Sequence, residues 1–134
     1  MKKIVFDSFA LIAFFRKEAG YELVRDLLVK ISNDESEGYM TTVNIGEIYY
    51  MICRKSNSKN AEEAIYALLH FPIQIIEADL KLTLEAAKLK AKYSFSFADA
   101  FAASLTINKK ATLITGDKEF EALDGETNFK VKYL

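Results

Sequence analysis

The chain has 134 residues, of which 51% are hydrophobic, so it has the usual size of one compact domain and can bury a core. Its 18 basic and 19 acidic side chains leave a net charge of −1, which excludes a global positive field for attracting nucleic acid. The single cysteine, Cys53, excludes an internal disulfide and a multi-cysteine zinc site, and it favours a reducing, cytoplasmic setting. We therefore expect one domain over residues 1–134, in which nucleic-acid binding would use local patches.

The chain begins with two lysines followed by apolar residues, an order also found in signal peptides. Asp7 interrupts that apolar run, however, and no small-residue cleavage site follows it. No stretch of the sequence approaches the roughly 20 apolar residues that span a bilayer. We therefore expect no membrane insertion. Internal repeats, low-complexity tracts and linkers rich in Pro, Gly or Ser are also absent from the sequence, which indicates continuous folding.

Short apolar runs alternate with segments of helical spacing along the chain. The apolar runs predict four buried strands and a weaker fifth, at 3–6, 39–41, 73–76, 112–115 and 129–133. Apolar residues three and four apart predict helices at 21–31, 44–54, 61–69, 80–93, 97–107 and 118–123. Parallel strands need crossover helices, and those helices must bury their apolar stripes against the sheet. The predicted fold is therefore α/β, a three-layer α/β/α sandwich with a mainly parallel sheet of about five strands.

Four acidic residues stand at the predicted ends of strands and starts of helices. Asp7 follows the first strand directly, and Asp117 follows the fourth. Glu47 lies in the first turns of the helix after the second strand, and Asp99 lies in the first turn of the helix that leads into the fourth. The carboxyl ends of parallel strands and the N-termini of the helices between them share one edge, where ligands bind. We expect all four acids at that edge, with Asp99 the least certain because the link 94–96 before its helix is short.

Four converging carboxylates would repel one another, and some would take up protons unless a cation neutralised them. An all-oxygen site favours Mg²⁺ or Mn²⁺ over zinc, which usually recruits Cys or His. Such an ion can lower the pKa of a bound water, orient it and neutralise the charge that builds on a phosphate. The acids therefore predict phosphodiester hydrolysis. The lone His70 rules out a mechanism that uses two histidines as general acid and base.

Each acid also has a structural interpretation. Asp99 stands three residues after Ser96, and Glu47 stands three residues after Asn44, which is the spacing of a helix capping box. The other two acids could belong to ordinary turns. Taken singly, each acid favours the structural interpretation, but the shared location of all four favours the metal site.

Four short segments carry a resemblance that extends over nearly the whole chain. In chain order they are VFDS at 5–8 with AL at 10–11, VNIGE at 43–47, FADAFAA at 97–103 and LITGDKEF at 113–120. Through their order and spacing the sequence resembles the PIN-domain nucleases and, more narrowly, the VapC-type toxins of toxin–antitoxin pairs. The resemblance implies a five-stranded parallel sheet and Mg²⁺- or Mn²⁺-dependent endoribonuclease activity. It also implies homodimers and inhibition by a small antitoxin protein.

The resemblance also assigns roles to residues. Asp7, Glu47 and Asp99 match the three principal acids of the family, and Asp117 matches a more variable fourth. Phe9 departs from the family pattern, which often has a second small polar residue there, so less can be inferred about hydrogen bonding around the site. The hydroxyl positions that help to orient the site are matched by Ser8 and Thr115.

Basic and aromatic residues are less informative. Lys118, beside Asp117, is the best candidate for a contact with a substrate phosphate. Basic pairs that could hold RNA more often solvate a surface; they are Arg16 with Lys17, Arg54 with Lys55, and Lys109 with Lys110. Aromatic residues that could line a dimer or antitoxin groove, although core packing is expected for most, are Phe14, Phe15, Tyr49 and Tyr50.

Two alternatives stay open beside a toxin ribonuclease. One is an RNA-processing or DNA-cleaving nuclease with the same site. The other is a non-catalytic module that keeps the fold and binds RNA or protein. Phosphatases that use an acid after the first strand need a second Asp at the position where this chain has Phe9. The sequence also has no glycine-rich loop that would indicate a nucleotide cofactor.

Overall fold

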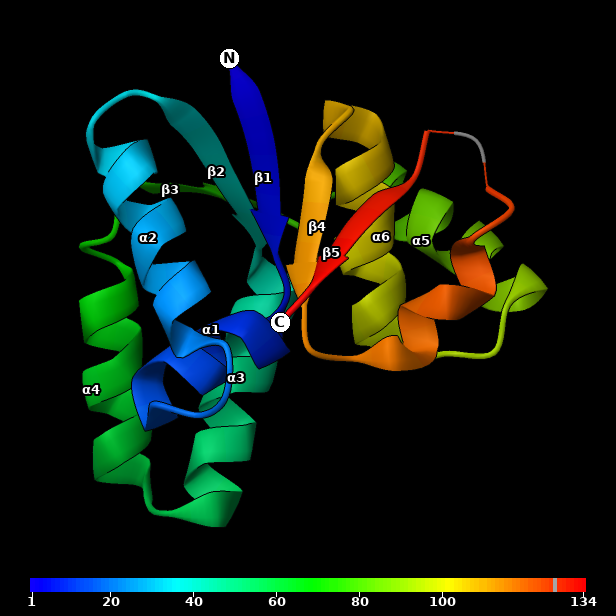
Figure 1. Ribbon diagram of the computed structural model, residues 1–134. Helices are drawn as coiled ribbons and strands as arrows, with labels where there is room; N and C mark the ends of the chain where they lie inside the picture. The colour runs from blue at the N-terminus through cyan, green and yellow to red at the C-terminus, as the bar shows by residue number, and fades with distance from the viewer. Residues whose placement is uncertain (127) are drawn as a thin grey trace.

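The computed structural model describes residues 1–126 and 128–134, and at its centre lies a parallel five-stranded sheet (Figure 1). The strand order is β3-β2-β1-β4-β5, and every neighbouring pair is parallel. The strands are β1 (Lys2–Phe6), β2 (Ser36–Thr41), β3 (Ile73–Ile76), β4 (Thr112–Thr115) and β5 (Lys130–Tyr133). The predicted sheet is therefore confirmed, including its weaker fifth strand.

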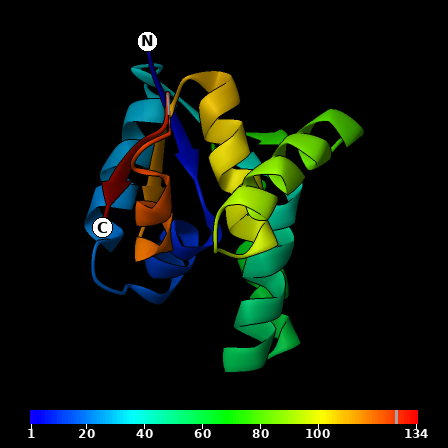
Figure 2. The same ribbon diagram turned by 90° about the vertical axis from the view of Figure 1, so that its right-hand side faces the viewer.

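Helices cover both faces of the sheet, as Figure 2 shows. They are α1 (Ser8–Arg16), α2 (Tyr21–Ser32), α3 (Thr42–Lys55), α4 (Ser58–Leu68), α5 (Leu80–Lys92), α6 (Phe97–Lys109) and the 3₁₀ helix η1 (Lys118–Leu123). Ile4 and Phe6 of β1 pack with the first four helices, whereas Val5 packs with α5, α6 and η1. Successive side chains of a strand point to opposite faces, so the two cores confirm the three-layer sandwich. No helix within the described residues is long and apolar enough to cross a membrane.

Three local predictions differ from the structure. Helix α1 was not predicted, because the run 9–15, in which every residue is apolar, shows no helical period. Strand β2 begins at Ser36, earlier than the predicted start at residue 39, since its first residues are polar or glycine. Residues 118–123 form a 3₁₀ helix, the tighter form common in short connectors, rather than an α-helix.

Polar side chains fix where the helices near the carboxyl edge of the sheet begin. Asp7 caps α1, Thr41 caps α3 and Ser96 caps α6, each by accepting a hydrogen bond from a backbone N–H three residues later. Asp7 directly follows β1, and Thr41 is the last residue of β2. These helices therefore start at the edge where the first two strands end.

Gly20 gives a test of the fold away from this edge. Its φ is +90°, and an added Cβ would lie 2.6 Å from the Cβ of Leu134. Gly20→Ala should therefore lower the free energy of unfolding by about 1–3 kcal/mol, because it combines a strained backbone with a clash. The exposed helical Gly46 has no atom within 4 Å of such a Cβ, so Gly46→Ala should instead stabilise the chain by about 0.5–1 kcal/mol. Urea unfolding measures both, and equal stabilities would contradict this account.

Candidate active site

The four predicted acids lie on segments that meet at the carboxyl edge of the sheet. Asp7 stands between β1 and α1, and Asp117 stands between β4 and η1. Glu47 lies on α3, and Asp99 lies in the first turn of α6. Asp7 is 0% exposed, Asp99 2% and Glu47 8%, whereas Asp117 is half-buried. Three carboxyl groups are therefore withdrawn from water, which is costly for a charged group without a partner.

Both carboxylate oxygens of Asp7 accept hydrogen bonds. Oδ1 accepts from the backbone N–H of Ala10 at 2.9 Å, and Oδ2 accepts from the hydroxyl of Thr115. Burial nevertheless raises the pKa of Asp7 to about 8, and the negative charges of Asp99 and Asp117 contribute. Without a cation, this side chain therefore holds a proton at neutral pH.

Asp99 occupies the centre of the acidic residues. Its pKa is raised to about 7, and burial is the largest cause. The negative charge of Asp117 is the next cause, and the charges of Glu47 and Glu119 raise the pKa further. The Ser96 side chain acts in the opposite direction, and its Oγ accepts the backbone N–H of Asp99 at 3.1 Å. Asp99 thus lies within electrostatic reach of acids from three other segments.

Glu47 is held by two hydroxyl groups, and a buried amide one turn away fixes the helix that carries it. Its Oε1 accepts from the hydroxyl of Ser8, and its Oε2 accepts from the hydroxyl of Tyr50 at 3.3 Å. Asn44, one turn earlier on α3, is 0% exposed and donates from Nδ2 to the carbonyl of Ala98 on α6 at 3.1 Å. This bond joins the starts of α3 and α6, and it fixes Glu47 relative to the first turn that carries Asp99.

The N-cap of α6 is the residue that the sequence spacing indicated, whereas the N-cap of α3 is a different one. Ser96 does cap α6, as the sequence spacing indicated for Asp99. Asn44 does not cap α3, because the cap is Thr41, whose Oγ1 accepts the Asn44 N–H at 3.1 Å. The capping-box interpretation of Glu47 was therefore wrong. No sequence signal indicated the bond between Asn44 and α6, because its partners are 54 residues apart.

A fifth acid, Glu119, was not predicted, and it forms a cluster with two of the four predicted acids. Carboxylate oxygens of Asp99, Asp117 and Glu119 lie within 4.8 Å of one another, whereas Asp7 and Glu47 are not part of this group. The backbone N–H of Glu119 donates to Oδ1 of Asp117 at 2.9 Å, and the N–H of Asp117 donates to Oγ1 of Thr115 at 2.9 Å. The turn after β4 therefore presents both acids together. The spacing Asp-x-Glu was the only sequence signal available for Glu119.

The donor set fits a hard divalent cation. The ion pairs formed among residues 1–126 and 128–134 join Arg16 to Glu18, Arg25 to Asp26, and Lys92 to Glu126. None of them neutralises an acid of the cluster, so the clustered charge has no partner among the described Lys and Arg side chains. Carboxylate oxygens without Cys or His are ligands that suit Mg²⁺ or Mn²⁺. Lys118 is exposed at the first residue of η1, next to Asp117.

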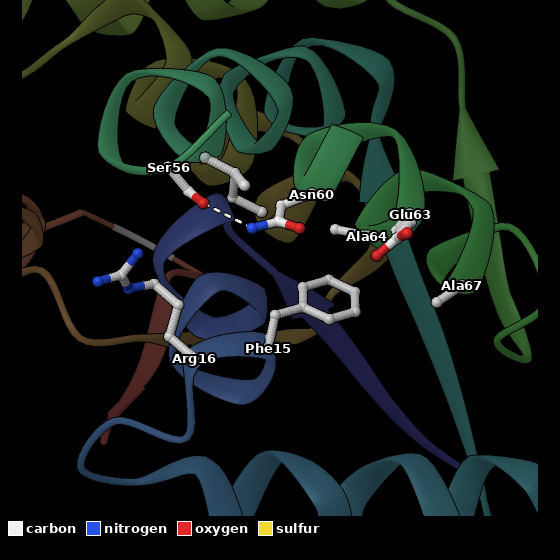
Figure 3. A pocket seen from close by; sticks show the side chains of 8 residues that line it. Phe15, Arg16, Ser56, Asn60, Glu63, Ala64 and Ala67 are labelled. Atoms are coloured by element: carbon white, nitrogen blue, oxygen red, sulfur yellow. Dashed lines mark hydrogen bonds between the residues drawn. The ribbon is translucent and has the colours of Figure 1, made fainter. Parts of the chain in front are cut away.

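A cavity of about 340 Å³ lies elsewhere, between α1, α3 and α4 (Figure 3). Within it the Nδ2 of Asn60 donates to the Oγ of Ser56 at 2.6 Å. The residues that line it are Phe15, Arg16, Ile52, Ser56, Asn60, Glu63, Ala64 and Ala67. None of the clustered acids is among them, so the candidate site is a separate feature.

The fold and the acids together define a class, that of α/β proteins with a carboxylate cluster at the carboxyl edge of a parallel sheet. The PIN domain family matches residues 4–126, which is most of the chain. The chain therefore belongs to the PIN domain family. None of the curated proteins compared with the chain matches it in sequence.

Solved structures share the fold. VapBC2 from Rickettsia felis, bound to a DNA fragment from its promoter, has a TM-score of 0.76 at 14% identity, over 98% of both chains. VapC20 of Mycobacterium tuberculosis, a toxin that cleaves the sarcin-ricin loop, has a TM-score of 0.73 at 15% identity, over 89% of this chain and 93% of that one. DNA-bound VapBC from Salmonella typhimurium has a TM-score of 0.73 at 11% identity, over 99% and 98%. At these identities the likeness is one of fold.

The raised pKa of Asp7 predicts how the stability of the metal-free protein depends on pH. The folded protein keeps the Asp7 proton up to about pH 8, whereas the unfolded chain loses it near the ordinary pKa of 3.8. The contribution of Asp7 to the free energy of unfolding is therefore complete below its pKa in the unfolded chain. It falls as the pH rises and is lost above its pKa in the folded protein. Asp7→Asn cannot ionise, so its melting temperature relative to the wild type should rise between about pH 4 and about pH 8. Thermal melts in chelator measure this difference, and a difference independent of pH would refute the assignment.

Proposed function

We propose that the chain is a divalent-metal-dependent endoribonuclease that acts as the toxin of a VapC-type toxin–antitoxin pair. The observation that carries the proposal is the cluster of acids around Asp99, which no described Lys or Arg neutralises. Membership of the PIN domain family supports nuclease activity. RNA as the substrate is supported by the sarcin-ricin loop that the similar VapC20 cleaves.

In this proposal the metal ligands come from Asp7, Glu47, Asp99 and Asp117, with Glu119 as a further donor. When bound, Mg²⁺ or Mn²⁺ supplies an activated water and neutralises charge on the phosphate. The hydroxyl of Thr115 holds Oδ2 of Asp7, and the hydroxyl of Ser8 holds Oε1 of Glu47. Each carboxylate oxygen has a second lone pair, so these bonds orient the acids without using up their capacity to bind a cation.

The proposed toxin has three binding partners, which are RNA, an antitoxin and a second copy of the chain. Lys118 follows Asp117 on the exposed surface, where its ammonium group can meet a phosphate of the RNA. A small antitoxin protein is the second partner, which the similar VapBC structures support. The third is a second copy of the chain in a homodimer. Residues 1–134 act as a single domain.

Mn²⁺ or Mg²⁺ at millimolar concentration should raise the melting temperature of the protein by several degrees, because a ligand specific to the folded state stabilises it. Asp99→Asn should abolish the rise, and Glu119→Gln should reduce it. The matched control is Asp26→Asn, an exposed acid on α2, which should keep the full rise. A wild-type protein that melts at the same temperature in Mn²⁺ and in chelator would refute the metal site.

Cleavage of labelled RNA in Mg²⁺ or Mn²⁺ tests the activity. Asp7→Asn and Asp99→Asn should each slow cleavage by about a hundredfold or more while the circular dichroism spectrum is retained, because each removes a charged ligand. Asp26→Asn should cut at the wild-type rate. RNA and DNA strands of one sequence should be compared, since only RNA carries the 2′-hydroxyl. Cleavage of DNA alone would favour the DNA-cleaving alternative, and metal binding without cleavage of either strand would favour the non-catalytic module.

A further inference from the structure

One face of α3 continues from the acids as a row of three side chains. Tyr50 follows Glu47 by three residues and Arg54 follows Tyr50 by four, so they are neighbours on the helix surface. Figure 1 shows that α3 starts at the carboxyl edge of the sheet and projects beyond it. The row therefore begins at the acids and extends about 10 Å along α3 from Glu47 to Arg54, at 1.5 Å per residue.

Tyr50 is fixed at two points and still open to solvent. Its hydroxyl donates to Oε2 of Glu47 at 3.3 Å, and the guanidinium carbon of Arg54 lies 5.1 Å from the centre of its ring. The residue is nevertheless 45% exposed. The structure thus holds an aromatic surface in place beside an acid of the candidate site.

Arg54 supplies a positive charge where the site needs one. The clustered acids repel the phosphates of any nucleic acid, and the net charge of −1 gives no general attraction. Arg54 takes part in none of the ion pairs formed by the described part of the chain. Its guanidinium group therefore keeps donors that can form paired hydrogen bonds to a phosphate.

We propose that Tyr50 and Arg54 form a binding platform for single-stranded RNA, in which the Tyr50 ring stacks on a nucleobase and Arg54 binds a backbone phosphate. Stacking on an aromatic ring combined with a nearby cation is the common way to hold a single strand without reading its sequence. The hydrogen bond between Tyr50 and Glu47 favours RNA over a protein partner, because it places the ring beside the acid itself. This inference rests on the proposed function, since it identifies the substrate surface of the same site.

RNA binding can be measured separately from cleavage in an Asp99→Asn background. Fluorescence anisotropy with a labelled single-stranded RNA would give the Kd over a range of salt concentrations. Tyr50→Leu should weaken binding about tenfold through the loss of stacking. Tyr50→Phe keeps the ring and should bind within about twofold of the parent. Arg54→Gln should weaken binding and lower the slope of log affinity against log salt by about 0.7, whereas Arg54→Lys should keep that slope.

Matched controls use residues of the same type away from the acids. Tyr66→Leu removes an exposed tyrosine on α4, and Arg25→Gln removes an exposed arginine on α2, so neither should change the Kd. The proposal is overturned if Tyr50→Leu and Arg54→Gln bind RNA as tightly as the parent, or if the parent binds no RNA. It is also overturned if affinity falls only where light scattering shows that an oligomer has dissociated. Binding that follows the expected pattern in a protein whose wild type cuts no RNA would instead support the platform and refute the nuclease.

Discussion

The buried carboxylate of Asp7 is the interaction on which the edge of the sheet depends. One of its oxygens caps α1 and the other accepts from Thr115 at the end of β4, so a single side chain ties a helix to two neighbouring strands. The Oγ1 of Thr115 also accepts the N–H of Asp117, which extends the network to the next acid. Two of the acids are thus positioned through one chain of hydrogen bonds, and the burial of Asp7 strengthens the repulsion between its charge and that of Asp117.

A second network positions the remaining acids by joining helices. Asn44 links the start of α3 to the carbonyl of Ala98, one residue before Asp99. Both Glu47 and Asp99 therefore sit on helix starts that are held against each other, and the partial positive charge of a helix N-terminus offsets part of the charge on Asp99. The rest of the negative charge on these acids is not offset by the helix. This remaining charge is the reason why the carboxylates suit a divalent ion and do more than cap a helix.

Much of this arrangement could be predicted from the sequence, for identifiable reasons. Acids at strand ends and helix starts can be located in the sequence, and the parallel sheet brings those positions to one edge. Three features could not be predicted. Helix α1 lacks a polar face, so its period was hidden. The contact of Asn44 with Ala98 depends on how two helices pack, and the orientation of Glu119 depends on a 3₁₀ turn that composition does not reveal.

The order of the strands has a consequence for biosynthesis. β1 lies at the centre of the sheet, between β2 and β4, and the bond from Thr115 to Asp7 joins residues 108 positions apart. Contacts so distant in the chain form late, because the loop they close must first be synthesised and collapsed. A chain emerging from the ribosome therefore carries Asp7 and Glu47 long before Asp99 and Asp117 exist to meet them. Any activity that needs all of these groups is therefore withheld until the segment through Asp117 has been synthesised.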